Sequence, residues 1–334
     1  MVSDAERTGD QFRDSATLSI VEEREYNARE LRGDDAVKEA PLATFSDALS
    51  SGEFVVTTEL NPPKGTDLEP LMRRAESLSA MVRAFNLTDS AGANMTMAPI
   101  AAAHLMIDRG IEPILQVTGR DRNRIALEGE ILAAAALGIR NVLCMSGDPP
   151  GRGDHPDAKG VFDLKAETLL EAVTAMNSGK DMYGNELKGT PALFAGAVAN
   201  PGADDVDTEL ARMEDKVRSG ALFFQTQAVY DAASFENFME GARGFGVPVL
   251  AGMIVLKSGG MARFLNDKLP GVSVPQSIID EMDGAEDRAE AGVRIAARLI
   301  DEVRGMCDGT HIMAIGWESR IPAILEAAGL PHGE

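Results

Sequence analysis

The chain has 334 residues, of which 44% are hydrophobic, and a formal net charge of -21 at pH 7. This length and composition can bury a large core, so they exclude a disordered or fibrous protein and predict one large α/β barrel or two smaller domains. The acidic balance argues against nucleic acid as a partner, because phosphate contacts need basic patches. With no long apolar stretch and no export signal in the sequence, we expect no membrane partner and a cytoplasmic protein.

Cysteine and histidine residues show no metal-binding pattern. The two cysteines lie far apart, and the four histidines lie on different predicted elements without i, i+4 pairing: Cys144, Cys307, His104, His155, His311 and His332. Neither a disulfide framework nor a metal site is therefore predicted.

Residues 1–48 show no strong pattern and are predicted to form an N-terminal extension, partly helical or disordered, with one helix over residues 16–31. Residues 49–334 instead repeat a unit of short apolar strand, turn and amphipathic helix. The predicted strands cover residues 54–60, 82–88, 111–118, 142–145, 192–198, 221–227, 248–255 and 311–315. The predicted helices begin at Asp67 and at Met261 and cover residues 98–109, 122–137, 166–176, 205–218, 232–244, 286–304 and 321–328.

Eight strands alternating with helices predict a closed (β/α)8 barrel, the TIM-barrel form of the α/β class. A doubly wound sheet would more often carry a Gly-rich dinucleotide fingerprint, and neither that fingerprint nor a P-loop occurs. A barrel places its chemistry at the carboxyl ends of its strands. The candidate site residues are therefore Glu59, Thr88, Asp89, Gln116, Thr118, Asp148, Asn200, Gln227 and Lys257.

Asp148 follows a short apolar run and stands in the turn Gly147-Asp148-Pro149-Pro150-Gly151. The two prolines restrict the backbone after Asp148, so we expect a firmly held carboxylate at the end of a buried strand. The alternative is an aspartate that only bonds its own turn.

Glu59 and Gln227 close two other predicted strands. Glu59 is followed by Asn61-Pro62-Pro63, and partial burial at a barrel mouth would raise its pKa and let it act as a general acid. Gln227 has an amide that both donates and accepts, which suits the edge of a pterin or flavin ring. A solvated acid and an ordinary turn residue are the respective alternatives.

The chain closely resembles the methylenetetrahydrofolate reductases, which are flavin-dependent (β/α)8 barrels of one-carbon metabolism and methionine biosynthesis. The resemblance covers about residues 54–330. It rests on five segments in the order and spacing of that family: Glu59-Leu-Asn-Pro-Pro63, Asn86-Leu-Thr88, Ser146-Gly-Asp-Pro-Pro-Gly151, Lys216-Val-Arg-Ser-Gly-Ala221 and Phe224-Gln-Thr-Gln227.

The resemblance implies roles for individual residues. Glu59 and Asp148 would be catalytic, Glu59 as the general acid and Asp148 as the acid that tunes the flavin and binds the pterin. Gln227 would join them in binding the folate. The implied cofactor is FAD, with FMN as the alternative, and its predicted contacts are Thr88, Gln116, Thr118, Gly147, Asp148, Phe162, Asn200 and Lys216.

The implied reaction is the reduction of 5,10-methylenetetrahydrofolate to 5-methyltetrahydrofolate. Gln116 and Asn200 stand where many members have histidine, and Ser258 and Met313 stand where aromatic residues often pack, so the donor is either NAD(P)H or a partner redox protein. We expect a homo-oligomer. Two other classes are open: a pterin-binding methyltransferase barrel without flavin, and a non-catalytic barrel subunit of a redox complex.

Overall fold

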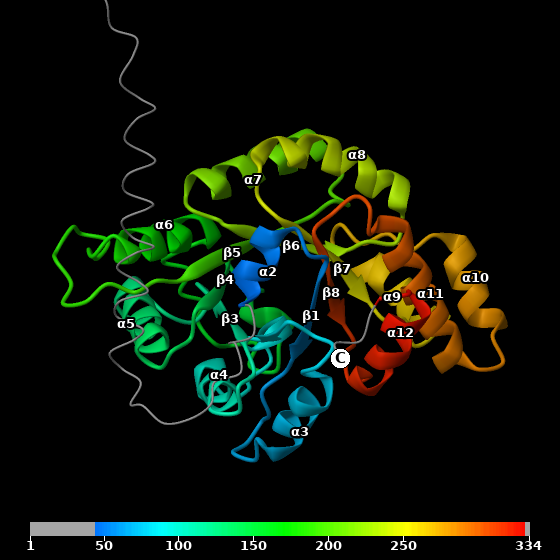
Figure 1. The fold of residues 1–334 in the computed structure, drawn as a ribbon, viewed down its shortest axis with the longest axis horizontal. Coiled ribbons are helices and arrows are strands. Elements are labelled where there is room, and N and C mark those ends of the chain that lie inside the picture. The colour runs from blue at the N-terminus through cyan, green and yellow to red at the C-terminus, as the bar shows by residue number, and fades with distance from the viewer. Residues whose placement is uncertain (1–43, 331–334) are drawn as a thin grey trace, which may run out of the picture. The chain divides into compact units, whose positions relative to one another are not determined.

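The computed structural model describes residues 44–330, and the predicted helix over residues 16–31 lies outside them (Figure 1). Eight parallel strands pair in sequence order and close into a barrel, which confirms the predicted (β/α)8 fold. The strands are β1 (Val55–Leu60), β2 (Ala84–Leu87), β3 (Pro113–Thr118), β4 (Asn141–Met145), β5 (Phe194–Ala199), β6 (Phe223–Ala228), β7 (Val249–Ile254) and β8 (Gly309–Met313).

Helices cover the outside of the barrel, so the strands are buried on both faces and their sequences read as apolar runs. Every residue of β7, for example, is buried. The helices are α3 (Glu69–Leu78), α4 (Pro99–Ile107), α5 (Arg124–Ala136), α6 (Ala166–Asn177), α7 (Val206–Arg218), α8 (Ala232–Ala242), α9 (Gly259–Lys268), α10 (Gln276–Gly284), α11 (Arg288–Val303) and α12 (Ile321–Ala327). Within residues 44–330, no helix combines the length and the apolar character needed to cross a membrane.

The segment between β7 and β8 contains α10, which the sequence analysis missed. This helix has nine residues and buries only Ile278, Ile279 and Met282. So few apolar positions do not establish a helical period, and the helix is stabilised by packing against its neighbours α9 and α11.

A short helix, α2 (Phe45–Ser51), closes the amino-terminal end of the barrel. It begins with a capping box, in which the Thr44 hydroxyl accepts from the Asp47 N–H and the Asp47 carboxylate accepts from the Thr44 N–H. The Phe45 ring lies edge-on to Phe223, with 5.1 Å between centroids. In Figure 1, α2 lies across the centre of the ring of strands, and it packs on the first inward-facing residues of the strands, among them Val55, Ala84, Ile114 and Leu250.

This helix crosses the expected boundary between residues 48 and 49. The compact unit that contains the barrel begins at Ala43. Phe45 is completely buried and Ala48 is nearly so, which places residues 44–48 with the barrel rather than with the extension. A segment of five residues carries too little pattern for the sequence to show this.

The inward-facing side chains form three layers, because every second residue of a strand points into the barrel. The layer against α2 is apolar. The middle layer contains buried polar side chains that are hydrogen-bonded to one another: Thr57, Asn86, Gln225 and His311. The third layer lies at the carboxyl ends of the strands. It includes the residues two positions further along these four strands: Glu59, Thr88, Gln227 and Met313.

Candidate active site

Glu59 lies on β1 at the mouth of the barrel with 20% of its side chain exposed. Burial, and to a smaller extent the nearby charge of Glu318, together raise the pKa of its carboxyl group to about 7. The Nε2 atom of His311 lies 4.0 Å from a Glu59 carboxyl oxygen. A carboxyl group that holds its proton near neutral pH while facing the mouth meets the chemical requirement for a general acid.

Glu318 was not among the predicted site residues. It opens the turn η4 (Glu318–Arg320) after β8 and is 7% exposed. Its carboxylate accepts a 2.7 Å hydrogen bond from the Gly316 N–H and lies 3.8 Å from Arg74. The sequence indicates Glu318 only as a carboxylate a few residues beyond a barrel strand. Its effect on the pKa of Glu59 could not be predicted, because that effect depends on closure of the barrel.

A cavity of about 380 Å³ opens at the carboxyl ends of β2 to β5. It is lined by Asp89 and Arg120 and by five of the residues predicted to contact a cofactor: Gln116, Thr118, Gly147, Asp148 and Lys216. The structure thus brings together an amide and a hydroxyl from β3, a carboxylate from the loop after β4 and a lysine from α7, which belong to three different strand–helix units.

Thr88, Phe162 and Asn200 are not among the residues that line this cavity. The Thr88 hydroxyl, which is almost fully buried, donates a 2.6 Å hydrogen bond to the Asn61 side chain. Phe162 lies in a loop with a φ of 46°, and its N–H donates to the Gly119 carbonyl. The Asn200 side chain lies directly against the backbone of Gly271, where no Cβ atom could fit.

Asp148 lies in the loop after β4, not at the end of the strand. The predicted strand over residues 142–145 matches β4, which ends at Met145, and Asp148 lies beyond it in the predicted turn, where Gly147 adopts a left-handed φ of 86°. The Asp148 carboxylate is 46% exposed and lies 3.2 Å from Arg152. Its position at the cavity wall therefore depends on the loop as well as on the two prolines.

Gly147 brings the loop after β4 directly against β3. A Cβ atom at this position would lie 3.0 Å from Cβ of Arg120 and 3.1 Å from Cβ of Thr118. Together with the positive φ, this close approach explains why glycine is needed here. The result is a cavity wall made of backbone.

Lys216 reaches the cavity from α7 and is 8% exposed. Its Nζ atom donates a 2.7 Å hydrogen bond to the Val198 carbonyl. Burial lowers the pKa of the ammonium group, while the neighbouring charge of Glu209 opposes this shift. The hydrogen bond to Val198 therefore holds a buried amino group in a fixed orientation at the edge of the cavity.

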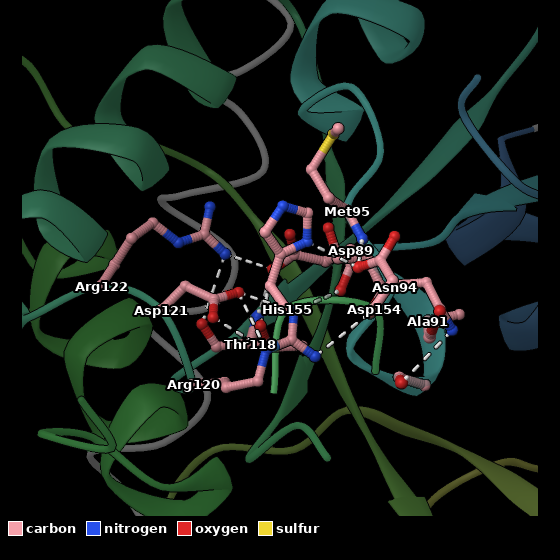
Figure 2. Close-up of polar contacts among 12 residues, drawn as sticks. Asp89, Ala91, Asn94, Met95, Thr118, Arg120, Asp121, Arg122, Asp154 and His155 are labelled. Carbon is pink, nitrogen blue, oxygen red and sulfur yellow. Dashed lines mark hydrogen bonds and ion pairs between the residues drawn. The ribbon is translucent and has the colours of Figure 1, made fainter. Parts of the chain in front are cut away.

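Asp89 organises a polar cluster beside the cavity (Figure 2). Its Oδ2 atom accepts hydrogen bonds from the Thr118 N–H at 2.9 Å and from the Thr118 hydroxyl at 2.8 Å, and it forms an ion pair with Arg122. Arg122 also pairs with Glu130 of α5. The Thr118 hydroxyl proton is therefore directed at Asp89, which leaves the lone pairs of the oxygen to accept from a ligand.

Asp154 joins three loops of the mouth. It accepts a 2.9 Å hydrogen bond from the Met95 N–H and lies 2.8 Å from a ring nitrogen of His155 (Figure 2). It also pairs with Lys64. Lys64 follows β1, Met95 follows β2 and Asp154 follows β4. These contacts hold the wall of the cavity in place from three strand–helix units.

Gln227 and Lys257 lie on the other side of the mouth. The Gln227 side-chain oxygen accepts from the Ala228 N–H at 3.2 Å, and within residues 44–330 its amide N–H₂ group donates to no partner, so that group can bind a ligand. Lys257 donates to the Ile315 carbonyl and lies 5.5 Å from the centre of the Trp317 ring. Ser258 caps α9 through a hydrogen bond from the Met261 N–H.

A second, larger cavity of about 570 Å³ lies between the loops after β5 and β6 and the segment before α10. Backbone and apolar groups make up much of its wall, including Pro201, Ala228 and Val229, and none of the predicted site residues lines it. Titratable and amide side chains instead lie around the smaller cavity and at Glu59, so we identify these as the candidate active site.

Comparison with known proteins agrees with this geometry. The family model described as methylenetetrahydrofolate reductase matches residues 44–329. The chain is 24% identical over 311 residues to methylenetetrahydrofolate reductase 2 of Schizosaccharomyces pombe, which covers 86% of this chain and 47% of that protein. It is 25% identical over 291 residues to a probable methylenetetrahydrofolate reductase (NADPH) of Caenorhabditis elegans, which covers 81% of this chain and 42% of that protein.

Among solved structures, the fold resembles that of an uncharacterized Clostridium thermocellum protein described as binding two copies of 5-methyl-5,6,7,8-tetrahydrofolic acid. The TM-score is 0.55 at 16% identity, over 84% of this chain and 96% of that one. The chain spans about half the length of the curated relatives it matches. Because the family model matches nearly the whole barrel, the chain belongs to the methylenetetrahydrofolate reductase family.

Proposed function

We propose that the protein is an oxidoreductase that reduces 5,10-methylenetetrahydrofolate to 5-methyltetrahydrofolate with the help of a flavin, in one-carbon metabolism. The observation that carries this proposal is Glu59, whose carboxyl group has a pKa of about 7 and faces the barrel mouth. Family membership supports the reaction class. The cavity at the carboxyl ends of β2 to β5 offers room for a second ligand at the mouth of the barrel.

The donor set of the cavity fits a flavin. Gln116 offers an amide to the edge of a heterocycle, and the backbone at Gly147 leaves a wall without a side chain. Lys216 offers a positive charge for an anionic group. A bound flavin, proposed to be FAD, would supply the hydride chemistry, accepting a hydride from the donor and passing one to the methylene carbon of the folate.

The chain's own residues would position the folate and move the proton. Glu59 donates its proton to the ring nitrogen that leaves the methylene carbon when the five-membered ring opens. Its partial burial keeps the proton available near neutral pH. Gln227 and Asp148 bind the pterin edge, Gln227 through its free amide N–H₂ group and Asp148 by accepting from the pterin amino group.

A nicotinamide nucleotide is the proposed electron donor. The relatives in Caenorhabditis elegans and Zea mays are named as NADPH and NADH forms, respectively. A partner redox protein is the alternative, and rapid mixing of the flavin-loaded protein with each nucleotide decides between them.

Flavin binding is the direct test of the proposal. We expect the purified full-length protein to be yellow or to become yellow with FAD, and Lys216→Met to weaken FAD binding by about tenfold or more, because a charge-assisted hydrogen bond is worth about 1.5–3 kcal/mol. Lys268→Met is the control, because Lys268 is an exposed lysine in the last turn of α9 and does not line the cavity. Fluorescence titration measures both affinities. A protein that takes up neither FAD nor FMN would instead favour a methyltransferase barrel without flavin.

Replacing Asp148 tests its two proposed contacts together. Asp148→Asn is expected to raise the flavin reduction potential by on the order of 30 mV, which corresponds to about 1.4 kcal/mol for a two-electron couple, and to weaken folate binding by about tenfold. Asp121→Asn is the control, because Asp121 is also 46% exposed and ion-paired but does not line the cavity. If redox titration and folate binding are unchanged in Asp148→Asn, the residue serves only its own turn.

A further inference from the structure

A chain of four buried polar side chains crosses the barrel interior beneath Glu59. Asn86 of β2, Gln225 of β6, Thr57 of β1 and His311 of β8 are each less than 5% exposed. The Gln225 amide lies 3.2 Å from the Thr57 hydroxyl, and that hydroxyl lies 2.9 Å from Nδ1 of His311. The reaction proposed above assigns no role to any of these four residues.

Asn86 and Gln225 exchange two hydrogen bonds, because Asn86 donates to the Gln225 oxygen at 2.6 Å and the Gln225 nitrogen donates to the Asn86 oxygen at 3.0 Å. From Gln225 onward the hydrogen bonds have one direction, since the same Gln225 nitrogen donates to the Thr57 hydroxyl at 3.2 Å. The Thr57 hydroxyl still has one proton to donate. Its nearest acceptor is Nδ1 of His311 at 2.9 Å, since the other one, the Thr310 carbonyl, lies at 3.5 Å.

This direction determines the tautomer of His311. An Nδ1 atom that accepts a proton from Thr57 carries none itself, so in the neutral ring the proton is on Nε2. Burial lowers the pKa of His311 to about 3, which keeps the ring neutral under ordinary conditions. The Nε2–H group is the one that faces the Glu59 carboxyl at 4.0 Å, a separation longer than a hydrogen bond, as is common for catalytic contacts before the substrate binds.

We propose that His311 is a positioning residue for Glu59, held as the Nε2–H tautomer by the Asn86–Gln225–Thr57 chain so that its N–H group orients the carboxyl and stabilises the carboxylate left after proton donation. The inference rests on the proposed role of Glu59 as the acid. The chain accounts for four buried polar residues in the interior of the barrel, where such folds commonly place apolar side chains.

Other groups around Glu59 act in the opposite direction. The Glu318 carboxylate, from η4, raises the pKa of Glu59, as does burial. Arg74 lies 3.8 Å from Glu318 and partly offsets that charge. From β7, the residue paired in register with His311 is Gly252, which contributes no side chain. An N–H donor to the carboxylate lowers the pKa, so its loss should move the pKa of Glu59 upward.

The tautomer can be measured without any activity assay. In the full-length protein labelled with ¹⁵N-histidine, with His311→Gln used for assignment, we expect the shifts of His311 to show an unprotonated Nδ1 and a protonated Nε2 from about pH 5 to 8. A protonated Nδ1 or a charged ring would overturn the proposal.

Thr57→Val removes the hydroxyl that directs the tautomer. We expect a mixture of tautomers for His311 in Thr57→Val and the wild-type tautomer in Thr57→Ser. Thr58→Val is the matched control, because the Thr58 hydroxyl is equally buried and donates to β8 at 2.6 Å from the opposite face of β1. An unchanged tautomer in Thr57→Val would show that the chain does not hold the ring.

The effect on Glu59 is a shift in its titration. With ¹³C-labelled glutamate, with Glu59→Gln for assignment, we expect Thr57→Val to raise the pKa of Glu59 by about half to one unit, and Thr58→Val to leave it unchanged. If folate is reduced, the alkaline limb of the folate half-reaction should move by the same amount. A protein that does not reduce folate would contradict the proposed function, whereas an unshifted carboxyl titration in Thr57→Val contradicts this inference alone.

Discussion

Glu59→Gln is expected to slow reduction of the folate by about 10²–10⁴-fold, the usual contribution of a general acid. Glutamine keeps the size and hydrogen-bonding capacity of glutamate but has no proton to give at neutral pH. Reduction of the flavin by its donor needs no such proton and should continue at close to the wild-type rate. Stopped-flow absorbance measures the two half-reactions separately, and an equal loss in both would show that Glu59 only positions other groups.

The pH dependence of the wild-type protein checks the same assignment. The acid works only while protonated, so folate reduction should fall as the pH rises above about 7, the pKa of Glu59.

The stability of the protein should also fall as the pH rises. A carboxyl group whose pKa is raised from 4.5 in the folded state lowers the free energy of unfolding as the pH rises from about 4.5 to 7, because the folded protein resists its ionisation. Glu59→Gln removes this loss, so the variant should be at least as stable as wild type at pH 8, and a less stable variant would indicate a folding defect.

Phe45→Ala is expected to lower the free energy of unfolding by about 3–5 kcal/mol, the usual cost of removing a buried phenylalanine ring. Phe45 is completely buried at the closed end of the barrel, and its ring contacts both Phe194 and Phe223 edge-on. Removing it leaves a cavity between α2 and the strands, which the rigid ring of strands cannot fill by relaxing. Urea unfolding of the full-length protein measures the difference.

Phe264→Ala is the matched control, because the Phe264 side chain is 57% exposed. Its free energy of unfolding should stay within about 0.5 kcal/mol of wild type. A loss below about 1 kcal/mol in Phe45→Ala would mean that α2 is not part of the cooperative unit of the barrel.

The alternation of strands and helices could be predicted from the sequence alone. Apolar strands such as 142–145 and 248–255 show their burial on both faces as a continuous run, and helices such as α11 show the helical period over sixteen residues. Glu59 and Gln227 could be chosen because a parallel barrel directs the ends of all its strands to one mouth. These conclusions depend on local pattern and on one topological rule.

Local sequence patterns did not predict the short or irregular segments. The five residues before the expected boundary belong to α2 and to the barrel because Phe45 has partners more than a hundred residues away, such as Phe223. Asp148 lies beyond its strand because Gly147 turns the backbone at a left-handed φ. Turns and short helices are decided by such contacts and by single backbone angles, which apolar periodicity does not record.

The electrostatic properties of Glu59 were decided only by the tertiary structure. Its raised pKa comes from burial and from Glu318, and the His311 ring that faces it lies on β8, at the other end of the chain. Closure of the barrel makes β1 and β8 neighbours and pairs Thr57 with His311. The sequence by itself thus determined which strand ends carry chemistry, while barrel closure and strand register determined which side chains meet there, because those contacts join residues that no local pattern connects.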